Sequence, residues 1–336
     1  MTGTGTDAAA SERPLRRQGR GGRRGEQLMV DRVEFTSYYG RPVIKEPTWA
    51  APDIAGYFFL GGLAGAGSVL AAGAQATGRP VMARALKTSS AVAVAGSAAA
   101  LVHDLGRPER FVNMLRVFKP TSPMSVGSWL LAGYGPAAGA SAVLTLTGRL
   151  PRVGTAATAG AALLGPAVAA YTAVLAADTA VPAWHDAYRE LPFVFVGSAI
   201  AAASGMALLS SPLGETAPAR RAALIGCAVE LTAAKVMERR LGMVAEPYRQ
   251  GPSGRLMQLA QGLSLVGAAG TLALAGRSRP GAALSGLALL AGSACTRFGV
   301  FHAGVASARD PKYTVAPQRE RLTRTDGRPQ GPRDAG

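Results

Sequence analysis

The chain has 336 residues, of which 48% are hydrophobic, 17% are charged and only 6% are aromatic, and its mean hydropathy is positive. This composition excludes a typical soluble domain, and the many Gly and Ala residues in its apolar runs suit helices that pack closely in lipid. The net charge of +16 comes mainly from Arg at the two ends and in loops between apolar runs, which indicates membrane topology rather than a groove for nucleic acid.

Few residues could bind a metal. Cys227 and Cys295 each stand alone in an apolar run, so neither an iron–sulfur cluster nor a zinc site is expected. Two bis-histidine haems would need four histidines, and the chain has three. We therefore predict that the chain holds no metal, no haem and no iron–sulfur cluster.

Residues 1–47 are rich in Gly and Arg and are predicted to be a disordered basic tail. The pair Arg16-Arg17 is not a twin-arginine signal, because no apolar segment follows it. Residues 48–308 are predicted to be an all-α membrane domain with eight transmembrane helices, and residues 309–336 a second disordered tail. The expected spans are about 52–75, 82–103, 126–147, 156–177, 191–211, 219–237, 256–276 and 281–305.

The charges predict the orientation, because an even number of spans places both termini on one side of the membrane. That side collects 25 Arg and Lys residues, and the other side collects nine. Cytoplasmic loops carry the excess of positive charge, so we expect a chain in the plasma membrane with both termini in the cytoplasm.

One polar loop, residues 101–129, separates two apolar spans and contains two dense motifs. The first, HDLGRPERF, begins at His103, and the second, KPTSPMSVGSW, ends at Trp129. Gly and Pro in the first motif also fit a simple helix end, and Ser122-Pro123 also fits a helix N-cap.

Alternation of the helices brings polar residues to the side of this loop. The start of the first span, the end of the second, the start of the third and the end of the fourth share one face of the membrane. Asp53 and Tyr57 lie one turn apart on one helix face, although Asp53 also fits a simple charge at a helix N-terminus. The polar residues at this face are Asp53, Tyr57, His103, Asp104, Ser122, Ser125, Trp129, Tyr171 and Asp178.

The two motifs resemble the polysulfide reductase NrfD family, the integral-membrane quinone-reacting subunits of molybdopterin and iron–sulfur oxidoreductases. The similarity lies in the order D-L-G-R-P-x-R-F followed by K-P-x-S-P-M-S-x-G-x-W. It extends to Tyr171-Thr172 in the fourth span and covers roughly residues 38–313.

This resemblance implies a pocket for a membrane quinone, menaquinone or a similar molecule, as bound substrate. Asp53 is expected to donate or accept its proton. The side chains expected to bind the quinone are Tyr57, Tyr171, His103, Ser125 and Trp129.

The resemblance also implies two partners, an iron–sulfur (ferredoxin-like) subunit and a molybdopterin catalytic subunit. Asp104, Arg107, Arg110 and Ser122 are expected to form the partner-docking loop, with Asp104 and Arg107 as an ion pair that fixes it. The expected function is electron exchange between the quinone and the docked iron–sulfur subunit. This chain would supply the pocket, the protonatable groups and the docking surface.

Ionisable residues inside spans are costly in lipid and are therefore functional candidates. Glu230 and Lys235 lie in the sixth predicted span and Arg297 in the eighth, and they fit either structural pairs or a proton route. Buried charges and Gly- and Pro-interrupted helices also fit a secondary transporter, although no inverted repeat is evident. A passive membrane anchor of a redox complex, without its own quinone site, is the third alternative.

Overall fold

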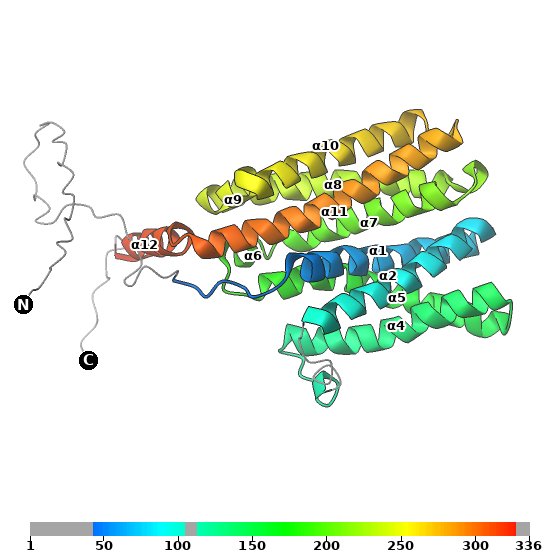
Figure 1. The fold of residues 1–336 in the computed structure, drawn as a ribbon, viewed down its shortest axis with the longest axis horizontal. Helices are drawn as coiled ribbons and strands as arrows, with labels where there is room; N and C mark the ends of the chain where they lie inside the picture. The colour runs from blue at the N-terminus through cyan, green and yellow to red at the C-terminus, as the bar shows by residue number, and fades with distance from the viewer. Residues whose placement is uncertain (1–42, 105–112, 327–336) are drawn as a thin grey trace, which may run out of the picture. The chain divides into compact units, whose positions relative to one another are not determined.

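The computed structural model describes residues 43–104 and 113–326, with side chains up to residue 319, and every regular element in these ranges is helical (Figure 1). The long helices are α1 (Ala51–Ala76), α2 (Pro80–Asp104), α4 (Pro123–Thr147), α5 (Pro151–Ala177), α7 (Leu191–Ser210), α8 (Ala217–Leu241), α10 (Gly251–Ala273) and α11 (Arg279–Arg309). The shorter elements are α6 (Pro182–His185), η1 (Leu213–Glu215), η2 (Gly242–Ala245), α9 (Glu246–Arg249) and α12 (Lys312–Asp326).

Within the described ranges, seven helices are long and apolar enough to cross a membrane: α1, α2, α4, α5, α7, α10 and α11. The chain is a multi-pass membrane protein. Helix α8 covers the predicted span 219–237 but does not belong to these seven, because charged residues such as Arg221, Glu230 and Lys235 recur along it. The all-helical prediction is thus confirmed, and the count of eight spans is not.

Proline marks the start of every long helix. The first or second position is proline in α1, α4, α5, α7, α8, α10 and α11, and α2 itself begins at Pro80. Proline has no N–H and its fixed φ suits the first turn, so these prolines both interrupt one apolar run and begin the next helix. The start of α2 is further capped by Glu215, whose carboxylate accepts a hydrogen bond from the Met82 N–H at 2.7 Å.

Helix α1 lies at the centre of the bundle, where it packs against α2, α5, α7 and α11. Figure 1 shows α2, α4 and α5 grouped to one side of α1 and α7, α8, α10 and α11 to the other. The crossing of α1 with α5 depends on two glycines, because a Cβ atom on Gly65 would lie 2.4 Å from the carbonyl oxygen of Gly165. Such close backbone contact is how helices pack in lipid, where apolar area alone provides no drive to associate.

The chain after α11 differs from the disordered tail that the sequence predicts, since α12 is helical as far as Asp326. Its first turn is held against α9 by Lys312 Nζ, 2.8 Å from Glu246 Oε2, and by the Tyr313 hydroxyl, 3.1 Å from the same oxygen. The Lys312 ammonium holds the pKa of the Glu246 carboxyl below its usual range. At this same end of the bundle, Oε1 of Glu46, which precedes α1, lies 2.5 Å from Nη2 of Arg309, the last residue of α11.

Candidate functional site

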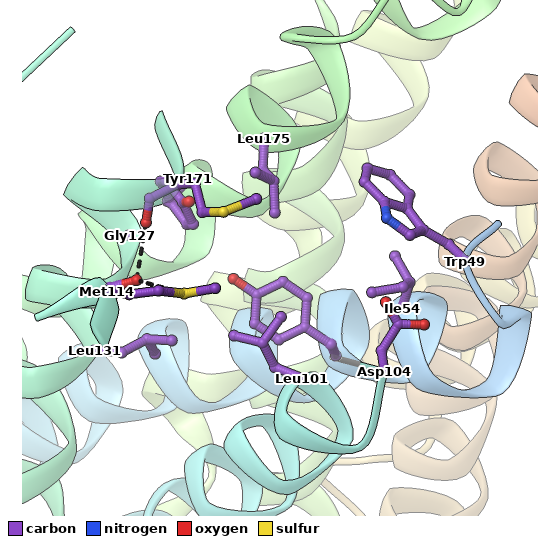
Figure 2. A pocket seen from close by; sticks show the side chains of 12 residues that line it. Trp49, Ile54, Leu101, Asp104, Met114, Gly127, Leu131, Tyr171 and Leu175 are labelled. Carbon is purple, nitrogen blue, oxygen red and sulfur yellow. Dashed lines mark hydrogen bonds between the residues drawn. The ribbon is translucent and has the colours of Figure 1, made fainter. Parts of the chain in front are cut away.

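A cavity of about 190 Å³ lies where α1 and α4 begin and α2 and α5 end (Figure 2). Ligand pockets are mostly apolar with a few polar groups, and this one follows that pattern. Its volume is below the roughly 300–1,000 Å³ of pockets for drug-sized molecules, so it suits a small planar ring system rather than a large ligand. The lining residues are Trp49, Ile54, Tyr57, Leu101, Asp104, Met114, Met124, Gly127, Ser128, Leu131, Tyr171 and Leu175.

Tyr57 brings a phenol from α1 to this cavity. Its side chain is only 2% exposed, and its ring packs against Phe58 with 5.7 Å between the ring centroids. Across residues 43–104 and 113–319, the Tyr57 hydroxyl makes no hydrogen bond. Buried hydroxyl groups are normally paired, since leaving one unpaired costs free energy. An unpaired phenol in a cavity wall therefore fits a group that binds a ligand.

Tyr171 reaches the same cavity from α5, but its hydroxyl already makes a hydrogen bond within the protein. It donates a hydrogen bond of 2.6 Å to the carbonyl oxygen of Pro123, at the start of α4. The ring fits because position 127 is glycine: a Cβ atom there would lie 2.0 Å from Cζ of Tyr171. The motif that contains Gly127 thus makes room for the aromatic ring of another helix.

Asp104 and Trp49 line the cavity on the side away from Met114 and Gly127, as Figure 2 shows. Oδ1 of Asp104 accepts a hydrogen bond of 3.2 Å from the N–H of Ala50, which joins the end of α2 to the start of α1. Trp49 stacks on Trp184 of α6, with ring centroids 5.7 Å apart. This side of the cavity is therefore lined by the carboxylate of Asp104 and the aromatic ring of Trp49.

Asp53 and His103 form a pair next to the cavity rather than in its lining. Oδ2 of Asp53 lies 2.9 Å from Nδ1 of His103, and the His103 side chain is 79% exposed. The predicted proton donor is therefore in contact with a histidine whose sequence neighbour, Asp104, faces the cavity.

The predicted residues of the second motif support the loop instead of lining the cavity. Ser125 accepts a hydrogen bond of 3.0 Å from the Lys119 N–H and donates one of 3.1 Å to the Val117 carbonyl oxygen. Trp129 is 42% exposed and meets Phe118 edge to face. Ser122 is the N-cap residue of α4 but makes no side-chain capping hydrogen bond. Arg107 and Arg110 of the predicted docking loop, including the predicted pair of Arg107 with Asp104, lie outside the described residues.

The sequence matches the family Polysulphide reductase, NrfD over residues 45–222. The chain belongs to the NrfD family. This match contains every residue that lines the cavity, whereas α10, α11 and most of α8 follow it. A comparison with curated proteins finds no match to this chain.

The three ionisable residues predicted inside spans follow the region of the NrfD match, and their environments in the structure differ from one another. Glu230 of α8 is buried and accepts hydrogen bonds from Thr296 at 2.6 Å and from Ser264 at 3.3 Å. Arg297 of α11 is fully buried; it donates to the Phe195 carbonyl oxygen at 2.6 Å and stacks over the Phe195 ring. Lys235 is exposed and lies 3.9 Å from Glu238. Glu230 and Arg297 thus share one polar region of the helix bundle, and Lys235 is apart from it.

Sequence reasoning missed the apolar wall of the NrfD cavity, although helical spacing gives a signal for it. Ile54 precedes Tyr57 by three residues, Leu175 follows Tyr171 by four, and Ser128 follows Met124 by four, so each pair shares a helix face. Trp49 and Met114 lie outside the long helices, and only the folded chain places them. In the part of the chain that the structure describes, no three His, Cys, Asp or Glu side chains gather as metal ligands would.

Proposed function

We propose that the chain is the membrane subunit of a multi-subunit oxidoreductase and exchanges electrons between a membrane quinone, such as menaquinone, and a docked iron–sulfur subunit. A molybdopterin catalytic subunit would complete the complex. Membership of the NrfD family supports this reading. The observation that carries it is the cavity at the family motif, which combines an unpaired buried phenol with a carboxylate and apolar walls.

The protein's groups suit distinct tasks around a quinone ring. The Tyr57 hydroxyl has a free proton and can donate it in a hydrogen bond to a ring oxygen. Tyr171 has one O–H, already given to Pro123, so it can act only as an acceptor or as part of the wall. Asp104 supplies a carboxylate inside the cavity, and Asp53 with His103 supplies a proton-exchanging pair beside it.

The surface next to the cavity suits a docked partner. Four large apolar side chains of the 117–129 segment are exposed: Val117, Phe118, Met124 and Trp129. An exposed apolar cluster is a common feature of protein interaction sites. We propose that the iron–sulfur subunit covers it and thereby comes close to the quinone cavity.

We also propose that α8 is an eighth span. Its end residues Arg220, Arg221, Arg239 and Arg240 would lie at the two membrane surfaces, and its central Glu230 is buried against α10 and α11 rather than in lipid. Eight alternating spans place both termini and the cavity on one side. The positive charges make that side the cytoplasm, with the chain in the plasma membrane.

Replacing one hydroxyl tests the proposed quinone site. Tyr57→Phe removes the free O–H and keeps the ring, so the assembled complex should still reduce an artificial dye while its electron exchange with quinone falls by at least about tenfold. Tyr248→Phe is the matched control, because Tyr248 is also buried and its hydroxyl bonds the Ala183 carbonyl oxygen away from the cavity. Equal quinone rates for both variants in intact complexes would favour the passive anchor.

A further inference from the structure

A second cavity, of about 250 Å³, lies at the opposite ends of α1, α2, α4 and α5 from the first. Each of the four helices contributes one polar side chain to it: Gln75, Lys87, Thr145 and Thr155. Leu144, Gly148, Pro151 and Gly154 complete the lining. None of these residues belongs to the proposed quinone site, so the second cavity needs its own explanation.

Lys87 is the central group of this cavity, and its charge is not balanced. The side chain is only 6% exposed. Its ammonium donates hydrogen bonds to Gln75 Oε1 and, at 3.0 Å, to Thr145 Oγ1, both of them neutral groups. An ammonium has three N–H groups, so one remains for another acceptor. No ion pair among residues 43–104 and 113–319 includes Lys87.

The surroundings add positive rather than negative potential. Helix α5 begins in the cavity wall at Pro151, and its N-cap residue Leu150 makes no side-chain cap, so the positive end of the helix dipole is left open. Arg149 and Arg152 are exposed beside it. Glu215, at this same edge, is engaged with backbone N–H groups at the start of α2. A buried cation without a counter-charge is costly, and an anion in the cavity would remove that cost.

The position of the cavity also fits a lipid. It lies at the ends of membrane-spanning helices, where phospholipid headgroups lie. Beside it, α4 and α5 expose the apolar side chains of Val143, Leu146 and Val153, which are about half exposed and could contact acyl chains.

We propose that this cavity is an anion site that takes a phosphate group, carried by an anionic phospholipid or present as free phosphate. Lys87 supplies the opposing charge and the free N–H. Gln75 and Thr145 hold the ammonium in place, and Thr155 fixes Gln75 by accepting a hydrogen bond of 3.0 Å from Gln75 Nε2. The site is separate from the quinone cavity, and its occupation does not depend on electron transfer.

Thermal unfolding of the purified full chain in detergent tests the proposal. We expect phosphatidylglycerol, titrated into the sample, to raise the unfolding temperature of the wild type, and phosphatidylcholine to raise it much less. Lys87→Met should weaken the phosphatidylglycerol response by at least about tenfold in concentration. Arg84→Met is the matched control, because Arg84 is exposed on the same helix and is not part of the lining.

Inorganic phosphate forms the second arm of the experiment. If phosphate alone raises the unfolding temperature and Lys87→Met abolishes this increase, free phosphate is the ligand. If only phosphatidylglycerol raises the unfolding temperature, the lipid is the ligand. If Lys87→Met fails to fold, Lys87→Gln keeps hydrogen bonds to the neighbouring groups without the charge. The proposal is overturned if wild-type protein responds equally to both lipids and not to phosphate, or if the Lys87 and Arg84 variants respond alike.

Discussion

Asp53 contacts His103 and does not line the cavity, which matters for how a proton could reach a bound ring. Asp53 Oδ2 lies 2.9 Å from His103 Nδ1, and the carboxylate in the cavity wall is that of Asp104. A proton exchanged by Asp53 would therefore pass through a neighbouring group. We therefore propose that Asp53, His103 and Asp104 act together at this edge.

Asp53→Asn keeps the shape of the side chain and removes its titration. We expect a complex that assembles and still reduces a dye, with electron exchange to quinone lowered by at least about tenfold, since acid–base assistance is typically worth about 10²–10⁴ in rate. Asp310→Asn, an exposed position after α11 that does not line the cavity, should have no effect. Unchanged quinone turnover in the Asp53 variant would make Asp53 a helix-end charge only.

Gly127 is the second residue on which the site depends. Gly127→Ala would place a methyl group 2.0 Å from Cζ of Tyr171, so the ring must leave its position and the wall of the cavity must change. We expect overpacking to lower the free energy of unfolding by about 1–3 kcal/mol, which thermal unfolding would show as a lower unfolding temperature. We also expect slower quinone exchange.

The same substitution at Gly135 of α4 is the control, because a Cβ atom there has no neighbour within 4 Å. Quinone rates that are equal in the Gly127 and Gly135 variants would show that the Tyr171 ring does not shape the site.

At the scale of the elements, α8 decides the topology of the chain. If α8 crosses the membrane, η1 before it and α9 after it lie on opposite sides. Reporter fusions after Gly214 and after Gln250 should then give opposite results, with the Gln250 fusion and a C-terminal fusion both behaving as cytoplasmic. The same behaviour at Gly214 and Gln250 would leave seven spans and place the two termini on opposite sides.

The whole molecule determines which steps of the proposed reaction this chain can perform. Its three histidines and two isolated cysteines do not supply the usual ligand sets for haem or iron–sulfur clusters. We expect the purified subunit to show no Soret band and no stoichiometric iron, and the assembled complex to contain iron from its partner. Iron that remains with the isolated chain would contradict the prediction that only the partner subunit binds iron.

Much of the fold is determined by the sequence alone. The apolar runs define the long helices, and the prolines between these runs mark where each helix begins, because proline fits the first turn. Pro136 and Pro166, by contrast, lie inside α4 and α5. Alternation of the spans then predicts which helix ends share a side, and the motif from Asp104 to Trp129 indicates the family. These features are local, so they can be read without knowing how the helices pack.

Only the tertiary structure decides which side chains at those ends face inward. Tyr57 and Tyr171 line the cavity, whereas Ser125 and Trp129 support the adjacent loop. Asp104, which the sequence assigns to the docking loop, lines the cavity as well. The rotation of each helix about its axis is set by contacts such as Gly65 on Gly165 and Gly127 on Tyr171. In lipid both faces of a helix can be apolar, so hydrophobic periodicity does not specify that rotation; close packing of small residues does.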